Sequence, residues 1–259
     1  METSLTGRRA LVCGASQGIG RACAEALAAA GASVTMLARS ADKLESVLAG
    51  LPGGDHHCLE ADLSNWSEAG ERVAVHVDEV GPVNILVHNS GGPKAGPAHQ
   101  ATPDDFLAGL TPHVLGGQSL VQAVLPGMRE SGYGRIINIV STSVVTPIKG
   151  LGVSNVVRGA INNWMRTLAY ELGPDGITVN NILPGYVGTD RLSSLMEGRA
   201  ERDGCSPSDV AAAWKASIPL GRFAEPDELG GVCAFLASPA AAYINGVNLP
   251  VDGGRLASM

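Results

Sequence analysis

The chain has 259 residues, of which 45% are hydrophobic and 17% charged, and this composition excludes a disordered chain. A formal net charge of −7, with no basic cluster, argues against a nucleic-acid partner, because neutralising phosphates requires a basic face. No apolar run approaches the ~20 residues that span a bilayer, and the N-terminus lacks a signal-peptide pattern, so we expect a cytoplasmic protein without a membrane partner.

Short apolar or β-branched runs alternate along the chain with longer stretches of helical period. The short runs predict strands at residues 9–13, 33–38, 57–60, 83–88, 135–140, 178–183 and 247–251. The longer stretches predict helices at residues 20–30, 41–48, 67–80, 103–130, 154–172 and 227–237. Strands and helices that alternate at this spacing predict an α/β domain of the doubly wound Rossmann type, with a mostly parallel seven-stranded sheet.

One segment breaks this alternation. Residues 190–222 are polar and helix-prone, and they contain no strand pattern. Because the chain shows neither an internal repeat nor a linker, we expect residues 1–259 to form a single domain. The segment at about 190–222 is then an insertion over the C-terminal edge of the sheet, where such folds bind ligands, and we expect it to cover the substrate.

The cysteine pattern bears on metal binding and on the redox compartment. The five cysteines include no Cys-x-x-Cys pair, and their number is odd. This pattern favours free thiols in a reducing compartment over disulfides or zinc ligands. We therefore expect no metal site.

A glycine-rich turn joins the first predicted strand to the first predicted helix. Its sequence is Gly14-Ala15-Ser16-Gln17-Gly18-Ile19-Gly20. Glycines at such a turn let the backbone approach a pyrophosphate, and the following helix directs its N-terminal N–H groups at the phosphates. The placement between a strand and a helix is the context that a dinucleotide site requires, so the turn predicts one.

The same residues also fit the nucleophile elbow of the α/β-hydrolases, through Gly14-x-Ser16-x-Gly18. That class needs an acid and then a histidine later in the chain, and the last histidine here is His113. The serine would also follow the first strand, before a sheet can form around it. We reject the hydrolase interpretation.

The end of the second predicted strand indicates which dinucleotide binds. NAD-binding proteins place an acid about 20 residues beyond the glycines, to bind the ribose 2′-hydroxyl. Here the sequence is Leu37-Ala38-Arg39-Ser40, which has no acid, and Arg39 can pair with a 2′-phosphate. Arg21 adds a second cation near the turn, so the sequence favours NADP(H) over NAD(H), although Arg39 could also be an ordinary solvated residue.

Taken together, these features resemble the short-chain dehydrogenase/reductase family along essentially the whole chain. The first landmark, Cys13-Gly14-x-x-x-Gly18-x-Gly20, is similar to the family's Thr-Gly-x-x-x-Gly-x-Gly. The later landmarks follow in order and are Asp62-Leu63, His88-Asn89-Ser90-Gly91, Pro184-Gly185-Tyr186-Val187-Gly188-Thr189 and Leu249-Pro250-Val251-Asp252-Gly253-Gly254. Among family members, the chain most resembles the 3-oxoacyl-carrier-protein reductases.

The resemblance implies a cofactor site and an assembly state. The residues implied to bind NADP(H) are Gly14, Ser16, Gly18, Ile19, Gly20, Arg39, Asp62, Leu63, Asn89, Ser90, Gly91, Arg158, Pro184, Gly185, Val187 and Thr189. Related proteins are usually tetramers. The helix at 154–172 carries Val156, Val157, Ile161, Trp164 and Leu168 on more than one face, so we expect a homotetramer, or at least a homodimer.

The catalytic positions depart from the family pattern, which is Asn, Ser, Tyr and Lys. The serine falls on Ser141, after the fifth predicted strand. Counting onward by the family's spacing places Ser154 at the tyrosine position and Arg158 at the lysine position, while the asparagine position falls on His113. A serine hydroxyl is far less acidic than a phenol, and an arginine stays charged, so this pair cannot act as the family's proton relay.

Two residues are candidates for a replacement acid. His113 would titrate near neutral pH if it faced the site, and Tyr186 lies in the Pro-Gly loop beside the expected nicotinamide. Each has a structural alternative, since His113 could make a structural hydrogen bond and Tyr186 could be a packing aromatic. Lys149 and His88 are weaker candidates.

Three functions remain open at this point. The first is an NADP(H)-dependent oxidoreductase that acts on a small carbonyl or alcohol substrate by an altered proton route. The second is a non-redox enzyme on the same scaffold, such as a lyase or isomerase. The third is a cofactor-binding protein without catalysis, which an intact cofactor site and a missing proton donor would suit. The family resemblance favours the first.

Overall fold

The computed structural model describes residues 2–258, and its central element is a twisted parallel sheet. Within these residues the strands are β1 (Arg9–Cys13), β2 (Ser33–Ala38), β3 (His57–Glu60), β4 (Ile85–His88), β5 (Gly134–Ile139), β6 (Ile177–Pro184) and β7 (Asn248–Val251). Their order is β3-β2-β1-β4-β5-β6-β7, and every pairing is parallel. The predicted seven-stranded sheet is confirmed, with bounds within two residues of those expected.

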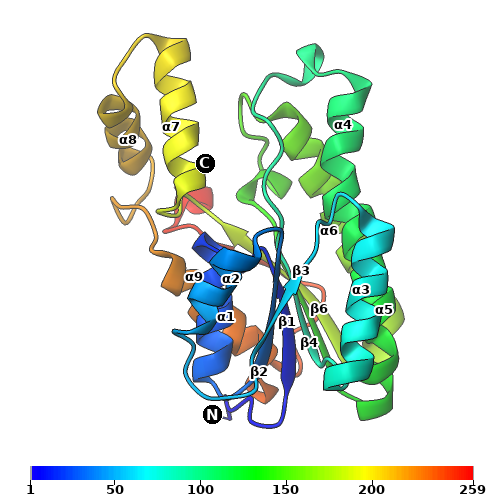
Figure 1. Ribbon diagram of the computed structural model, residues 1–259. Helices are drawn as coiled ribbons and strands as arrows, with labels where there is room; N and C mark the ends of the chain where they lie inside the picture. Colours follow the sequence, from blue (N-terminus) through cyan, green and yellow to red (C-terminus); the bar gives the residue numbers. More distant parts are fainter. Residues whose placement is uncertain (1, 259) are drawn as a thin grey trace.

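Helices cover both faces of the sheet (Figure 1). One face carries α1 (Gly18–Ala29), α2 (Ala41–Leu48) and α9 (Pro226–Ala237). The other carries α3 (Trp66–Val80), α5 (Gly116–Ser131) and α6 (Gly152–Leu172). Because both faces are covered, β1, β4 and β5 are almost wholly buried, and the polar side chains that β5 carries, Arg135 and Asn138, are buried as well.

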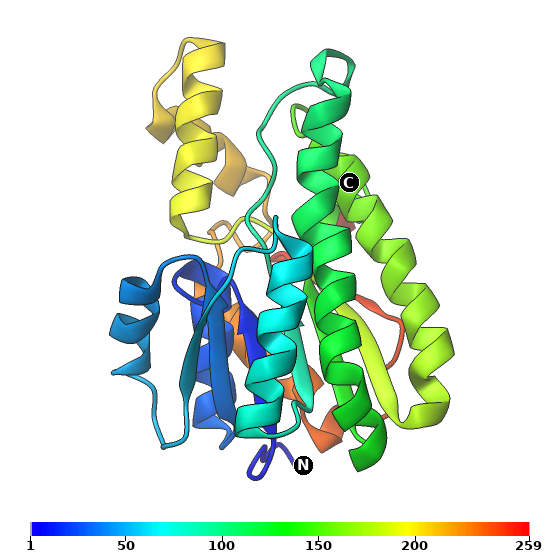
Figure 2. The same ribbon diagram turned by 45° about the vertical axis from the view of Figure 1, so that its right-hand side comes forward.

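The long helical region expected at residues 103–130 is continuous but not uniform (Figure 2). It consists of α4 (Pro103–Leu110), a π-helical turn (Thr111–Leu115) and α5. Pro112 lies in the π-helical turn and has no N–H to donate to the helix ladder, which accounts for the change of hydrogen-bonding register there. The periodicity of the sequence predicts the helix but not this turn.

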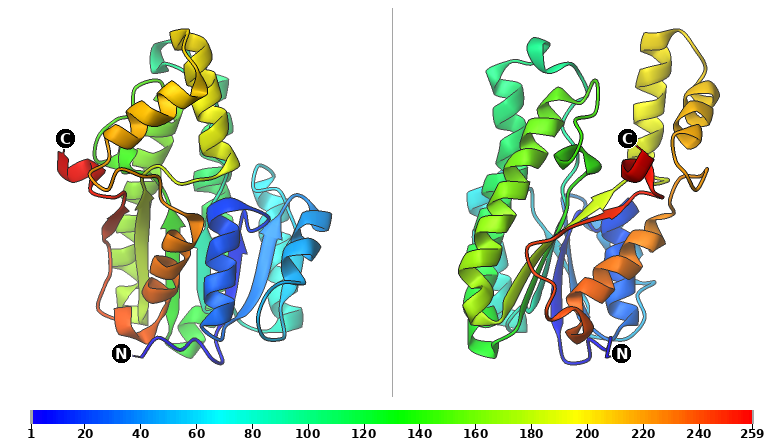
Figure 3. Two further views of the ribbon diagram at one scale, coloured as in Figure 1. Left: turned by 90° about the vertical axis from the view of Figure 1, so that its left-hand side faces the viewer. Right: turned by 180° about the vertical axis from the view of Figure 1, so that it is seen from behind.

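The segment that breaks the strand–helix alternation forms two helices above the carboxyl ends of the strands (Figure 3). They are α7 (Asp190–Asp203) and α8 (Pro207–Ala216). Thr189 caps the start of α7 by accepting a hydrogen bond from the Leu192 N–H, and Ser206 caps α8 in the same way through the Asp209 N–H. As expected, this segment contains no regular strand.

Two observations bear on the cellular setting. All five cysteines are free thiols, and Cys13, Cys23 and Cys233 are buried in the core. Among residues 2–258, no helix combines the length and apolar character needed to cross a membrane.

The packing of α1 against α9 depends on a glycine, which generates a prediction. A Cβ on Gly230 would lie 2.5 Å from the carbonyl oxygen of Ala22, closer than carbon and oxygen can approach. We expect Gly230→Ala to lower the free energy of unfolding by about 1–3 kcal/mol, because the two helices must separate. Denaturant unfolding followed by circular dichroism measures this change.

The adjacent residue supplies the control. A Cβ on Gly231 meets no atom within 4 Å, so Gly231→Ala should keep or raise stability, because alanine favours a helix by about 0.5–1 kcal/mol over glycine. Equal losses from the two substitutions would contradict this account of the α1–α9 contact.

Candidate functional site

A cavity of about 1370 Å³ opens at the carboxyl ends of the strands. The strand order reverses between β1 and β4, and a crevice at this point is where doubly wound sheets bind ligands. The glycine-rich turn lies at one wall, the loops after β4 and β5 lie at the other, and α7 borders the cavity from above.

The glycine-rich turn has the backbone that a phosphate site requires. Gly14 and Gly18 adopt positive φ values of 61° and 57°, which L residues rarely take. A Cβ on Gly20 would lie 2.2 Å from the Gly14 carbonyl oxygen, so this residue must be glycine for the turn to close on α1. The first turn of α1 contains no acidic residue, and its positive end is therefore free to attract an anion.

Asn89 connects the turn to the loop after β4. Its Nδ2 donates a hydrogen bond of 3.2 Å to the carbonyl oxygen of Cys13, at the end of β1. The same nitrogen would lie 2.7 Å from a Cβ on Gly14 or on Gly20. The residue that the family resemblance assigns to cofactor binding thus also holds the two loops of the crevice together.

The cations at the α2 end of the cavity differ in their freedom to bind a ligand. Arg39 is exposed, lines the cavity and forms no ion pair among the described residues. Arg21 is instead paired with Glu25 at 2.8 Å, so the second cation expected from the sequence is partly neutralised. Lys43, on the first turn of α2, lines the same region and was not predicted.

Most of the predicted cofactor residues do line this one cavity. They are Gly14, Ser16, Gly18, Ile19, Arg39, Asp62, Leu63, Asn89, Ser90, Gly91, Arg158, Pro184, Gly185 and Thr189. Gly20 and Val187 are the exceptions: Gly20 serves the close packing of the turn, and Val187 is buried and bridges to Ala224.

Ser141, Ser154 and Arg158 converge on the cavity from two elements. Ser141 follows β5, and its Oγ accepts a hydrogen bond of 3.1 Å from the Ser143 N–H. Ser154 and Arg158 are four residues apart on α6, so they share one face of that helix. The structure therefore brings together three of the residues that the sequence predicts to be catalytic.

Arg158 is a buried cation. Only 7% of the residue is exposed, its Nη1 donates to the Ile139 carbonyl oxygen at 3.2 Å, and its Nε has no hydrogen-bond partner. Burial and then the nearby charge of Arg191 lower its pKa from 12.5 to about 10. Arg158 consequently remains charged at neutral pH, as expected from its chemistry.

His113 and His88 lie beside this cation but outside the lining of the cavity. His113 is buried, and its Nδ1–H donates to the Gly109 carbonyl oxygen at 2.8 Å. Burial, and then the charge of Arg158, lower its pKa to about 2. Burial likewise lowers the pKa of His88 to about 4. His113 was expected to titrate near neutral pH only if it faced the site. It does not line the cavity, and the structural alternative, a buried hydrogen bond within the helix, describes it.

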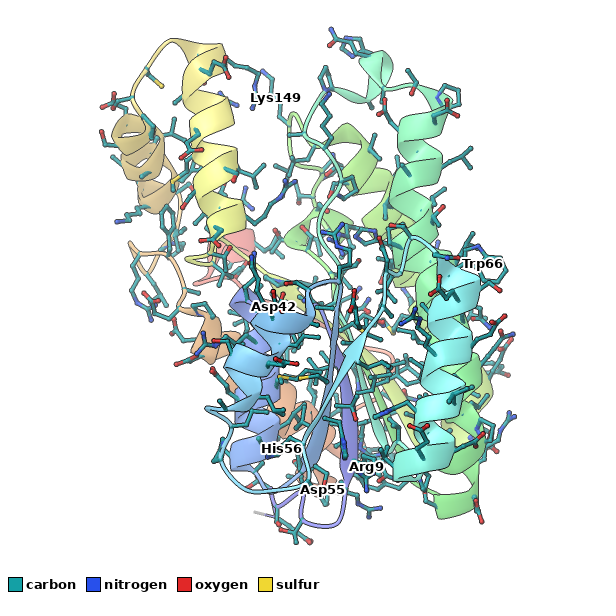
Figure 4. All side chains as sticks on the ribbon, viewed as in Figure 1. Arg9, Asp42, Asp55, His56, Trp66 and Lys149 are labelled. Carbon is teal, nitrogen blue, oxygen red and sulfur yellow. The ribbon has the colours of Figure 1, made fainter. Side chains whose placement is uncertain are left out.

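Tyr186 also takes the structural role. Its ring stacks on Trp214 with centroids 4.7 Å apart and an angle of 8°, and the guanidinium of Arg255 lies 4.9 Å above it. The ring joins the Pro-Gly loop to α8, and the cavity is lined by its neighbour Gly185 rather than by Tyr186 itself. Lys149 is exposed, and Figure 4 shows it in the upper part of the molecule, in the loop before α6.

The sequence analysis missed Arg191. It is the second residue of α7, it lines the cavity, and its Nη2 donates to the Pro93 carbonyl oxygen at 2.7 Å. Its position two residues after Thr189 was the available signal. Among residues 2–258, no group of three His, Cys, Asp or Glu side chains is arranged to hold a metal ion.

Comparison with known proteins identifies the family. The model described as enoyl-(acyl carrier protein) reductase matches residues 14–255. The chain belongs to the short-chain dehydrogenase/reductase family. It is 32% identical to a 3-oxoacyl-[acyl-carrier-protein] reductase of Synechocystis sp., over 98% of this chain and 99% of that protein.

Other members of the short-chain dehydrogenase/reductase family show similar agreement. Gluconate 5-dehydrogenase of Gluconobacter oxydans is 31% identical over 99% of this chain and 97% of that protein. The crystal structure of L-sorbose reductase from Gluconobacter frateurii, complexed with NADPH and L-sorbose, superposes with a TM-score of 0.92 at 29% identity, covering 99% of each chain. The dinucleotide of that complex is the one predicted here from Arg39.

The buried imidazoles generate a prediction about pH. Because His113 and His88 have folded pKa values of about 2 and 4, both well below the unfolded value of 6.5, only the unfolded chain takes up these protons on mild acidification. Stability is therefore full above pH 6.5 and falls as pH drops below it, by up to about 1.4 kcal/mol per pH unit for each histidine.

Between pH 6 and about 4.5, we expect the free energy of unfolding of His113→Asn to fall less steeply with decreasing pH than that of wild type, because the contribution of one histidine is removed. Denaturant titrations at each pH measure this free energy. His99→Asn, at an exposed histidine, should leave the slope unchanged. An unaltered slope in the His113 variant would show that this imidazole is not buried in its neutral form.

Proposed function

We propose that the protein is an NADP(H)-dependent oxidoreductase that acts on a small carbonyl or alcohol substrate. Its activity would be similar to that of a 3-oxoacyl reductase. The observation that carries the proposal is a single cavity lined by the glycine-rich turn, Arg39 and Ser141. One ligand that extends from the turn to Ser141 would bring its reactive end to the position where the family performs its chemistry.

The lining residues suggest one direction for the dinucleotide in the cavity. Its phosphates would bind at the N-terminus of α1, and its 2′-phosphate beside Arg39 and Lys43. Asp62 and Leu63 would contact the adenine, and the loops at 89–91 and 184–189 would hold the nicotinamide half. The NADPH bound in L-sorbose reductase supports this choice of cofactor.

The cofactor would supply or accept the hydride, and the protein's own groups would manage the charge on the substrate oxygen. The Ser141 hydroxyl can donate a hydrogen bond to a carbonyl or a developing oxyanion. The buried charge of Arg158 favours negative charge nearby, since the interior screens it weakly. With His113 and Tyr186 outside the cavity lining, we propose that the proton comes from solvent, beside Ser141 and Ser154.

The residues at the catalytic positions support a second candidate function. Ser154 and Arg158 occupy the positions where the family resemblance places tyrosine and lysine, so the usual proton donor is absent while the cofactor site is complete. A cofactor-binding protein without catalysis, or a non-redox lyase or isomerase, would have the same features. We rank these below the oxidoreductase because the chain belongs to a family of reductases and dehydrogenases.

We further propose the domain organisation and setting expected from the sequence. Residues 1–259 form one domain, in which α7 and α8 cover the substrate. On α6, Val157, Ile161 and Leu168 are buried within the chain, while Val156 is 50% exposed and Tyr170 is 88% exposed. The exposed pair would meet another subunit in a homotetramer. Free thiols suit a cytoplasmic protein, which we expect to have no nucleic-acid or membrane partner.

The cofactor preference can be tested together with turnover. We expect NADPH to bind more tightly than NADH, and Arg39→Ala to weaken NADPH binding about tenfold or more, since a charge-assisted hydrogen bond contributes about 1.5–3 kcal/mol. NADH affinity should hardly change. Titration calorimetry measures both affinities, and NADPH absorbance then follows slow oxidation in the presence of 3-oxoacyl esters.

Arg72→Ala is the matched control, because Arg72 is paired with Glu68 on α3 and removing it changes the net charge equally. Equal affinities for the two dinucleotides, unchanged by Arg39→Ala, would remove the argument for NADP(H). Tight NADPH binding with no oxidation by any carbonyl compound would favour the non-catalytic or non-redox function.

A further inference from the structure

Besides Arg39, two further arginines line the cavity without an acidic partner. Arg158 comes from α6 and Arg191 from α7, and neither forms an ion pair within the part of the chain that the structure describes. The neighbouring acid, Asp190, is exposed and pairs with neither of them. Arg158 is buried and Arg191 is exposed, and the lack of an acidic partner is unusual for the buried one, because buried cations are normally paired.

The unpaired charge of Arg158 is the more costly of the two, because this residue is buried. It is 93% buried, since only 7% of the residue is exposed, and its Nε has no partner. Its one hydrogen bond to protein is the 3.2 Å bond to the Ile139 carbonyl oxygen. A carbonyl dipole cannot neutralise a full charge, so the guanidinium retains most of its capacity to bind an anion.

Arg191 approaches the same space from the opposite wall. Its Nη2 bonds the Pro93 carbonyl oxygen at 2.7 Å, which bridges α7 and the loop after β4. Both residues line the same cavity, and the charge of Arg191 contributes to the lowered pKa of Arg158, so an anion between them would offset two positive charges. Arg191 is exposed, and the Pro93 carbonyl is a neutral acceptor. A charged acceptor, which forms a stronger hydrogen bond, can therefore replace the Pro93 carbonyl as the partner of the guanidinium.

We propose that the substrate carries a carboxylate that binds between Arg158 and Arg191, with the Arg191 guanidinium exchanging the Pro93 carbonyl for it. The proposal rests on the proposed function, because it names the substrate class of the same cavity: small oxo acids or hydroxy acids, rather than neutral esters. The planar forks of the two arginines match the geometry of a carboxylate, and its negative charge offsets their positive charges. The Ser141 and Ser154 hydroxyls, which line the same cavity, remain free for the carbonyl.

The cofactor phosphates are the other possible source of an anion. They are expected at the glycine-rich turn and the N-terminus of α1, whereas Arg158 lies beside Ser141 and Ile139, at the end of β5. The family resemblance also assigns Arg158 to the dinucleotide, but a neutral hydroxyl of the dinucleotide that contacts it would leave its charge uncompensated. An anion that binds after the dinucleotide is in place would therefore be a separate ligand. In the test, NADP⁺ is therefore bound first and the anion is added second.

Acetoacetate, a small 3-oxo acid, and methyl acetoacetate, its neutral ester, are the matched probes. Each is titrated by calorimetry into the protein with NADP⁺ bound, so that no hydride can be transferred to the ketone. We expect acetoacetate to bind roughly 10- to 100-fold more tightly than the ester, the range of one or two charge-assisted hydrogen bonds.

We expect Arg191→Gln to lower acetoacetate affinity about tenfold or more without changing the affinity for the ester. Arg191→Lys should retain part of the preference, because it keeps the charge and loses the planar fork. Arg202→Gln, near the far end of the same helix, is the control and should change neither affinity. Unchanged NADP⁺ binding shows that each variant is folded.

Equal affinities for acid and ester, or an Arg191→Gln variant that binds acetoacetate as well as wild type, would overturn the proposal. Acetoacetate that binds the free protein and is displaced by NADP⁺ would assign the arginine pair to the cofactor phosphates and overturn it as well. Failure of NADP⁺ itself to bind would instead refute the proposed function, and the acid–ester comparison on the free protein would still decide whether the arginine pair binds a carboxylate.

Discussion

The burial of Arg158 without a carboxylate partner is the constraint on which the rest of the site depends. Moving a cation out of water costs several kcal/mol, and here one backbone carbonyl offsets only part of it. The charge also helps to keep the neighbouring imidazoles of His88 and His113 neutral, since each pKa is lowered in part by Arg158. Among the described residues behind the cavity, Arg158 is thus a buried positive charge, and the two imidazoles beside it do not exchange protons near neutral pH.

This arrangement separates two tasks that the short-chain dehydrogenase/reductase family usually combines at one site. Binding of the dinucleotide depends on backbone geometry, on the end of α1 and on the cations near α2, and all of these are present. In the family pattern, proton transfer depends on a phenol held near a lysine, and counting along the sequence predicts Ser154 and Arg158 at those two positions. A fixed charge can stabilise an oxyanion or bind a carboxylate, but it cannot shuttle a proton.

Much of the fold could be predicted because it follows from local patterns. Short, largely apolar or β-branched runs that alternate with stretches of helical period indicate the seven strands, since strands covered on both faces bury most of their side chains. The cofactor residues could be predicted as a set because parallel strands bring their carboxyl ends to one edge. The π-helical turn around Pro112 could not, because its effect on the register depends on how the helix continues on either side.

The roles of single side chains were harder to predict, because they depend on contacts between distant segments. His113 bonds within its own helix, and Tyr186 stacks on Trp214, 28 positions further along the chain. Sequence spacing placed Tyr186 beside the expected nicotinamide and His113 at the family's asparagine position, but it could not give the orientation of either side chain. Arg191 was missed because its hydrogen bond joins α7 to Pro93, which lies 98 residues earlier in the chain.

The most direct test of the displaced proton donor is the double substitution Ser154→Tyr with Arg158→Lys, assayed for NADPH-dependent reduction of a 3-oxoacyl ester. A restored phenol and ammonium should raise the rate by about 10²–10⁴-fold over wild type, the usual contribution of a general acid. Either substitution alone should achieve much less, because the two groups act as a unit. A double variant that binds NADPH tightly and reduces the ester no faster than wild type would contradict the account.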